Sequence, residues 1–248
     1  MKKILVIGEK CTDAFIYGES KRLSPEAPVP VFTPTQRTVN DGMAGNVVAN
    51  LKALTSEYEI EFVHQKELIT KTRYVDYRSN HMFLRVDEGE NQIEPLAFTN
   101  ELEQQILNAD VVVVSDYDKG FLSEHMLLLI GSFSKFCVLD TKKKIQAGTI
   151  KSYNFIKWNE SEYNNNNTVD SKDLSRIIVT LGSRGALYMG TLHPSPSPKE
   201  TIDVSGAGDT FLSAFLVKYL EVGDVSTSIV HANKVASIVI SKRGVALP

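Results

Sequence analysis

Short apolar runs alternate with amphipathic stretches along most of the 248-residue chain. The runs have no polar face, which is typical of strands buried on both sides of a parallel sheet, and the stretches between them follow the helical repeat. Alternating strands and helices predict an α/β fold, a three-layer α/β/α arrangement around a largely parallel sheet. The predicted strands cover 3–8, 60–64, 110–115, 136–140, 153–157, 177–181 and 186–190. The predicted helices cover 42–54, 99–108, 123–133 and 225–241, and a further helix begins at the GAGD sequence of 206–209.

Two regions depart from this alternation and carry a different β pattern. Residues 14–33 contain the short pieces FIYG and VPVF around RLSPEAPVP, whose three prolines exclude a helix and favour an extended path. Residues 72–86 have the pattern of a hairpin with Ser79 and Asn80 at its turn. We expect both regions to form one small β-sheet lid on a single domain spanning 1–248. Its exposed edge would pair with a second subunit in a homodimer.

Composition and charge narrow the functional class. Hydrophobic residues make up 42% and charged residues 23% of the chain, which is ordinary for a globular protein. The net charge of −3 offers no basic field for nucleic acid or an anionic membrane, so we expect a small-molecule substrate. Cys11 and Cys137 are far apart in sequence, which favours reduced thiols in a cytoplasmic protein. No stretch has the length of a signal peptide core or a membrane span.

The segment TIDVSGAGDTFLSAFL, residues 201–216, passes from an extended stretch through a glycine turn into a helix. Gly206 and Gly208 permit backbone angles closed to other residues, so neighbouring amides can form a cup for an anion. The positive end of the helix dipole adds to that cup. Asp209 then has two interpretations. It either stabilises the first helical turn or takes the proton of a hydroxyl that attacks a phosphoryl group.

Other polar residues follow predicted strands or begin predicted helices, and each has two interpretations. Asp13 comes soon after the first strand, near the sheet edge where α/β proteins bind ligands, and either grips sugar hydroxyls or is an ordinary loop residue. Asn46 either caps its own helix or holds a substrate hydroxyl. Asp116 and Lys119, in SDYDKG, lie at a strand's carboxyl end, although solvated turn residues would look similar. Lys142 follows the strand that ends at Asp140.

Taken in order, these segments resemble the ribokinase-like carbohydrate kinases of the PfkB family. DVSGAGD resembles the family signature, and RLSPEAPVP resembles the branch of heptose 7-phosphate kinases in the bacterial ADP-heptose pathway that leads to lipopolysaccharide. The resemblance implies ATP- and Mg²⁺-dependent phosphorylation of D-glycero-D-manno-heptose 7-phosphate at the anomeric hydroxyl, giving the 1,7-bisphosphate. A kinase of another sugar or of a nucleoside remains open, as does a non-catalytic sugar- or nucleotide-binding homologue.

The resemblance also implies roles for individual residues. The catalytic base would be Asp209, with an anion hole formed by Gly206, Ala207 and Gly208. The sugar would be bound by Asp13, Gly42 and Asn46, and Asp116 is a further candidate from its place at a strand end. Independently of the resemblance, the basic residues Arg85, Lys119 and Lys142 could hold a remote phosphate on the sugar, although such residues are also common on protein surfaces. The nucleotide side would comprise Asn159, Thr180, Gly182, Gly185 and Asn233. Metal positions would be Glu162 for Mg²⁺, and Asp203 and Ser205 near a monovalent cation such as K⁺.

The sequence also departs from the family pattern. Met43 replaces the second glycine of the usual pair and is expected to crowd the sugar pocket, and Asp118 replaces a glycine in SDYxKG. The chain is shorter than usual members within 54–70 and 162–177. The second shortening affects the nucleotide side, so we expect it to bear on ATP affinity more than on the chemistry.

Overall fold

The computed structural model describes residues 2–166, 169–196, 204–242 and 244–248. Its larger sheet, sheet A, consists of β1 (Lys2–Gly8), β4 (Tyr58–Val63), β7 (Val111–Asp116), β8 (Cys137–Thr141), β9 (Phe155–Asn159), β10 (Ile177–Thr180), β11 (Ala186–Tyr188) and β12 (Thr191–His193). The order is β12-β11-β10-β9-β8-β7-β1-β4. The strands from β10 to β4 pair in parallel, whereas β11 and β12 run antiparallel at one edge. The prediction of a largely parallel α/β sheet is confirmed.

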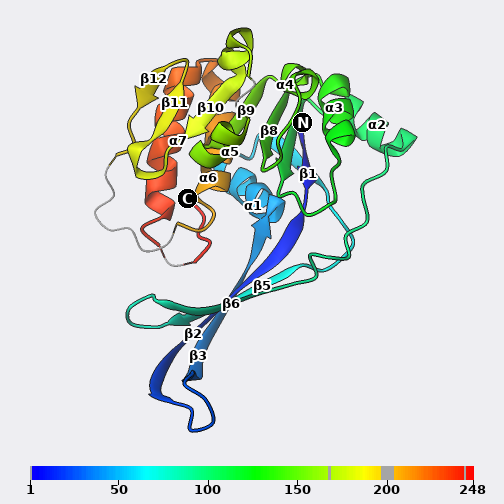
Figure 1. Cartoon of the computed structure of the whole chain (residues 1–248). Coiled ribbons are helices and arrows are strands. Elements are labelled where there is room, and N and C mark those ends of the chain that lie inside the picture. The colour runs from blue at the N-terminus through cyan, green and yellow to red at the C-terminus, as the bar shows by residue number, and fades with distance from the viewer. Residues whose placement is uncertain (1, 167–168, 197–203, 243) are drawn as a thin grey trace.

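Helices cover both faces of sheet A (Figure 1). They are α1 (Ala44–Leu54), α2 (Asn100–Asn108), α3 (Glu124–Phe133), α4 (Ala147–Ser152), α5 (Glu160–Asn165), α6 (Ala207–Val222) and α7 (Val225–Val239), with short 3₁₀ turns at Ser171–Arg176 and Gly182–Arg184. Alternate residues of β1 point to opposite faces. Ile4 and Val6 pack with α1, α6 and α7, while Leu5 and Ile7 pack with α2, α3 and α4. The result is the predicted three-layer arrangement.

Local signals located most helix starts correctly and missed the shortest elements. Thr99 and Ser123 cap α2 and α3 by accepting hydrogen bonds from Leu102 and Met126 amides. Helix α4 and strand β12 were not predicted, because six and three residues carry too little periodicity. The strand predicted for 186–190 ends at Tyr188, since the next two residues form a turn with positive φ.

A second sheet, sheet B, extends away from the body (Figure 1). It consists of β2 (Lys10–Leu23), β3 (Pro30–Met43), β5 (Thr70–Asp76) and β6 (Met82–Glu88), in the order β3-β2-β5-β6. The short pieces expected within 14–33 are instead parts of two 14-residue strands. Strand β3 tolerates Pro34 because it is an edge strand and Pro34 faces Gly18 at a register shift. The predicted hairpin is present as β5 and β6, with Asn80 in its turn at φ 58°.

The strand register gives sheet B two different faces. Asp13 is paired with Lys71, and Lys71 with Asp87; Arg73 is paired with Arg85. Directly paired residues share a face. These charged residues therefore lie on the face toward α6, as the cavity described below confirms. The opposite face carries Ile16, Val39, Tyr74, Leu84 and Val86.

Among the described residues, no helix is both long and apolar enough to cross a membrane.

Candidate active site

Asp209 lies in the first turn of α6, beside the ends of the central strands of sheet A, and is 5% exposed. Gly206 is the N-cap of this helix and has a left-handed conformation with φ 78°. A Cβ atom at Gly206 would come within 2.6 Å of the Asn46 amide nitrogen. Glycine is therefore required both by the backbone angle and by the close approach of α1.

Both carboxylate oxygens of Asp209 accept a hydrogen bond. The Asn46 Nδ2 donates to Oδ2 at 2.9 Å, and the Tyr117 hydroxyl donates to Oδ1 at 2.6 Å. Burial raises the pKa of Asp209 to about 6, and the two hydrogen bonds oppose that rise by favouring the ionised form. Asp140 raises the pKa further, and Lys157 lowers it. A carboxylate with such a pKa is better suited to accept a proton near neutral pH than an ordinary aspartate.

Asn46 is oriented by a buried chain of polar groups between α1 and α6. Asn50 Nδ2 donates to the Asn46 side-chain oxygen at 3.0 Å, and the Thr210 hydroxyl donates to Asn50 Oδ1 at 2.9 Å. This arrangement leaves the Asn46 amide nitrogen to face Asp209. Asn46 does not cap its helix, because α1 begins at Ala44 and its N-cap position is Met43. Of the two interpretations for Asn46, helix capping is wrong.

A cavity of about 190 Å³ opens between the charged face of sheet B and the start of α6. Its lining comprises Cys11, Asp13, Met43, Asn46, Lys71, Arg73, Arg85, Tyr117, Lys142, Ser205, Gly206, Asp209 and Val245. Gly42 lies behind Asp13, and a Cβ atom there would come within 2.2 Å of Asp13 Oδ2. Met43 is buried at φ 56°, a conformation that non-glycine side chains rarely adopt, and it occupies part of the cavity wall as expected.

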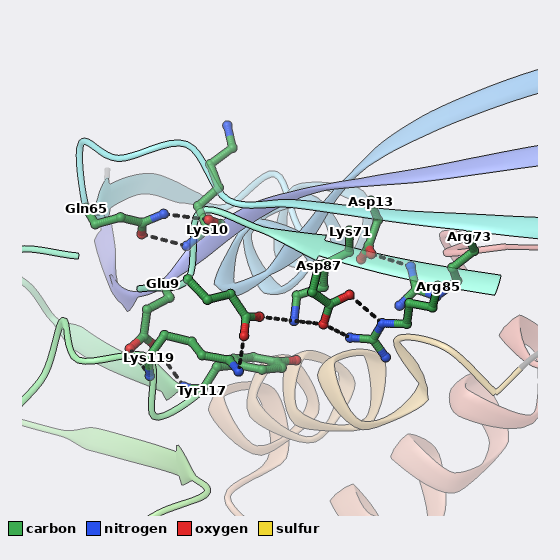
Figure 2. A network of polar contacts seen from close by, with 11 residues as sticks. Glu9, Lys10, Asp13, Gln65, Lys71, Arg73, Arg85, Asp87, Tyr117 and Lys119 are labelled. Carbon is green, nitrogen blue, oxygen red and sulfur yellow. Dashed lines mark hydrogen bonds and ion pairs between the residues drawn. The ribbon is translucent and has the colours of Figure 1, made fainter. Parts of the chain in front are cut away.

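Positive charge predominates in this first cavity. Arg73 pairs with Asp13 (Figure 2), and Lys71 pairs with Glu90 at 2.8 Å. Arg85 forms a two-point contact with Asp87 and still lines the cavity. Lys142 lies 4.2 Å from the centre of the Tyr117 ring, and no ion pair between described residues includes it. Desolvation and the charge of Lys71 lower the pKa of Lys142, and a bound anion would oppose both effects because it favours the charged ammonium.

A second cavity of about 160 Å³ meets the first at Asp209. Its lining comprises Asp116, Tyr117, Asp140, Lys142, Lys157, Asn159, Glu162, Gly206, Gly208 and Asp209. Lys157 pairs with Asp140 at 2.6 Å, and its Nζ would lie 3.2 Å from a Cβ atom at Gly208. A cation thus lies beside the glycine turn at the positive end of α6. The two cavities share Tyr117, Lys142, Gly206 and Asp209.

Asn159 and Glu162 form a capping box at the start of α5. The Glu162 amide donates to Asn159 Oδ1 at 2.9 Å, and the Asn159 amide donates to Glu162 Oε2 at 2.7 Å. Burial raises the pKa of Glu162.

Asp116 also borders this second cavity, where Lys143 and the Thr141 hydroxyl bind it. Asp116 therefore lies away from the sugar-side cavity in which it was expected.

Several expected site residues do not border either cavity. Lys119 pairs with Glu90 at 2.6 Å, which draws its charge away from the site. The Ala207 amide donates to the Val204 carbonyl, so this part of the expected anion hole is occupied by an internal bond. Asn233 donates to the His193 and Pro194 carbonyls and thereby connects α7 to the end of β12.

The remaining nucleotide-side residues cluster around the end of β10. Thr180 donates to the Trp158 carbonyl, Gly182 has φ 60°, and Gly185 cannot carry a Cβ atom because the His193 carbonyl would lie 2.1 Å away. These contacts are structural, and neither cavity reaches them. Ser205 lines the first cavity, whereas Asp203 lies outside the described residues.

Sequence reasoning missed five polar residues of the site: Lys71, Arg73, Tyr117, Asp140 and Lys157. Lys71 and Arg73 occupy alternate buried positions of β5, so the period-two pattern of TKTRYV carried a usable signal. Lys157 is a charged residue inside an otherwise buried strand, which is unusual enough to flag. Nothing in the sequence indicated that Tyr117 would reach Asp209.

A parallel α/β body, a small projecting sheet and a buried aspartate at a glycine-capped helix start define a kinase of the ribokinase-like fold. The family comparison gives the same answer, since the model of pfkB family carbohydrate kinases matches residues 56–248. The chain belongs to this family and is a carbohydrate kinase.

The curated relatives are longer proteins. The bifunctional protein HldE of Helicobacter pylori strain HPAG1 is 30% identical over 302 aligned positions, which cover all of this chain and 64% of that protein. HldE of Nitratiruptor sp. is 31% identical, with 98% of this chain and 62% of that protein covered. The chain thus spans less than two thirds of these relatives. The alignment also exceeds the length of the chain, in keeping with the expected internal shortening.

Solved structures agree on the fold. Phosphofructokinase-2 from Escherichia coli, in complex with potassium, has a TM-score of 0.75 at 16% identity and covers 100% of this chain and 95% of its own. Arabidopsis thaliana ribokinase, complexed with ribose and ATP, has a TM-score of 0.68 at 15% identity, with 98% and 94% covered. At such identities the likeness concerns the fold alone.

Proposed function

We propose that this chain transfers the γ-phosphoryl group of ATP to the anomeric hydroxyl of a heptose 7-phosphate, forming the 1,7-bisphosphate. The observation that carries the proposal is the meeting of two polar cavities at Asp209. One cavity offers hydroxyl-binding groups and cations, and the other offers a lysine, carboxylates and a helix start. Two such cavities could hold the sugar acceptor and the phosphate donor on opposite sides of Asp209.

In this proposal Asp209 accepts the proton of the acceptor hydroxyl, and Asn46 and Tyr117 hold its carboxylate. Phosphoryl transfer has a loose transition state that needs proton removal only late, so positioning and charge stabilisation supply most of the rate. Lys157, which lies beside Gly208, and the amides of Gly206 and Gly208 are proposed to stabilise the negative charge that develops, whereas the Ala207 amide is bound to the Val204 carbonyl. The donor side is proposed to extend toward Asn159.

A phosphate on the acceptor accounts for the cations of the first cavity. Lys71 and Arg73 already have acidic partners, whereas Lys142 has none among the described ion pairs. Lys142 is exposed at the cavity and lines both cavities, so its charge is available to bind an anion. The resemblance of RLSPEAPVP to the heptose 7-phosphate kinases supports a heptose as the sugar.

Mg²⁺ fits the acidic side of the second cavity. This ion is commonly held by one or two carboxylates together with substrate phosphates, and Glu162 is the carboxylate proposed for it. Among the described residues, no three or more His, Cys, Asp or Glu side chains are grouped so as to hold a metal by themselves. When bound, the ion would neutralise charge on the phosphates. K⁺ is proposed beside Ser205, by analogy with the potassium complex of phosphofructokinase-2.

The direct test is a panel of sugars and sugar phosphates assayed for ADP release with ATP and Mg²⁺. We expect turnover with D-glycero-D-manno-heptose 7-phosphate and a 1,7-bisphosphate as the product, identified by mass and by phosphorus NMR. Faster turnover with a hexose or a nucleoside would reassign the acceptor. Binding of these compounds without ADP release would identify a non-catalytic homologue.

We further propose a homodimer formed through the outward face of sheet B. Leu84 is 55% exposed and Val39 is 51% exposed on that face, although both are apolar. Sedimentation at micromolar concentration is expected to give a dimer, and Leu84→Glu a monomer, because an exposed apolar sheet face invites pairing. Val230→Glu is the control, since Val230 is 54% exposed on α7, far from sheet B in sequence and fold. A wild-type monomer, with or without substrates, would refute this interface.

A further inference from the structure

Tyr117 connects the turn after β7 to the carboxylate of Asp209. Its hydroxyl donates to Asp209 Oδ1 at 2.6 Å, across 92 residues of sequence. Its ring also lies 4.2 Å below the Lys142 ammonium, so that the residue borders both cavities. Tyr117 is thus the contact from the sheet A side that complements Asn46, which reaches the same carboxylate from α1.

The backbone of Tyr117 is fixed by Glu9, which follows β1. The Glu9 carboxylate accepts hydrogen bonds from the amides of Tyr117 at 2.8 Å and Lys119 at 3.1 Å (Figure 2). Glu9 is 0% exposed, and no ion pair between described residues includes it. Burial and Asp116 raise the pKa of Glu9, while the two amide bonds oppose the rise. A buried carboxylate is costly, and its contacts serve to hold this one turn.

We propose that Tyr117 is a positioning residue, which orients the Asp209 carboxylate for proton transfer and favours its ionised form, and that Glu9 fixes Tyr117 for this task. The proposal rests on the proposed function, because it assigns Asp209 the role of base. A carboxylate has about four lone-pair positions. Tyr117 and Asn46 occupy one on each oxygen, which leaves each oxygen able to accept from a substrate hydroxyl.

The hydrogen bond from Tyr117 to Asp209 persists while Asp209 titrates, because of the groups that surround this carboxylate. The charged or titratable groups that face Asp209 come from three places: Asp140 and Lys157 from sheet A, Lys71 and Arg73 from sheet B, and Cys11, Tyr117 and Lys142 at the first cavity. Burial raises the pKa of Cys11 to about 12 and that of Tyr117 well above 10, so both stay neutral at working pH. Tyr117 therefore remains a hydrogen-bond donor throughout the range in which Asp209 titrates.

The test is Tyr117→Phe, which keeps the ring beside Lys142 and removes only the hydroxyl. A hydrogen bond to a charged group is typically strong enough to move the pKa of that group by about one to two units. Because the bond favours the ionised carboxylate, its loss raises the pKa of Asp209. The acid limb of kcat/KM is therefore expected near pH 6 in the wild type and about one to two pH units higher in the variant.

Tyr153→Phe is the matched control. Tyr153 is also buried, but its hydroxyl donates to the Leu127 carbonyl on the other face of sheet A. This variant is expected to lower the melting temperature without moving the acid limb. An unmoved acid limb in Tyr117→Phe would overturn the proposal. Glu9→Gln, which leaves one of the two amides without a full acceptor, should move the limb in the same direction by a smaller amount.

A second measurement needs no turnover. The loss in melting temperature caused by Tyr117→Phe is expected to be larger at pH 8 than at pH 5, because the missing bond is to an ionised carboxylate. In an Asp209→Asn background this pH dependence should vanish. If it persists there, Tyr117 does not act on Asp209 and the inference fails. If it vanishes but no sugar is phosphorylated, the contact stands and the proposed function fails.

Discussion

Replacing Asp209 by asparagine is expected to lower kcat by about 10²–10⁴-fold, the usual contribution of a general base. Asparagine keeps the size of the side chain. Its side-chain oxygen can still accept a hydrogen bond from Asn46, and its amide nitrogen can donate to the hydroxyl oxygen of Tyr117. The anion-binding turn and Lys157 are unchanged, so ATP binding should persist. Steady-state kinetics and calorimetric titration with ATP measure the two quantities separately.

Stability provides a check that the variant is folded. The pKa of Asp209 in the folded chain is about 6, above its ordinary value, so the ionised carboxylate costs free energy of folding at pH values above that ordinary pKa. Asparagine removes this cost, and the melting temperature at pH 8 should not fall. Asp224→Asn is a matched control, because Asp224 caps α7 at an exposed position and asparagine caps equally well. Near-normal turnover in Asp209→Asn would end the assignment of the base.

The second large effect concerns the phosphate on the acceptor. A heptose 7-phosphate is expected to exceed the unphosphorylated heptose in kcat/KM by at least about a hundredfold. Each charge-assisted hydrogen bond to the phosphate contributes about 1.5–3 kcal/mol, and about 1.4 kcal/mol is a factor of ten, so two such bonds are sufficient. Lys142→Ala should reduce this ratio while changing the rate on the unphosphorylated heptose little. Arg85→Ala should reduce it less, since Asp87 already engages that guanidinium at two points.

Lys144→Ala is the control for this series. Lys144 is exposed two residues beyond Lys142 and lines neither cavity, so it tests whether removing charge from this segment is sufficient. The ratio should be unchanged in that variant. Equal use of heptose and heptose 7-phosphate by the wild type would show that the cations of the first cavity do not recognise a phosphate. A hexose or nucleoside acceptor would then be favoured.

The sequence carried much of the fold because its signals are local. The apolar runs, the caps at Thr99 and Ser123 and the glycine turn at Gly206 each act over a few residues, and they were sufficient for the three-layer arrangement. Sheet B was harder to delimit. Strand β3 is mostly exposed and contains Pro30 and Pro34, so the alternation that marks a strand is weak along most of its length.

The sequence by itself determined the class of enzyme and predicted Asp209 as its base, through the GAGD turn and the motifs around it. The tertiary structure alone decided which charges meet. Lys119 forms an ion pair with Glu90, and Asp116 forms one with Lys143. Lys71 and Arg73 line the cavity that also contains Asp209, from the side of sheet B. The hydroxyl of Tyr117 reaches Asp209 across 92 residues. Such pairings depend on the register and direction of strands distant in sequence, and no local pattern encodes them.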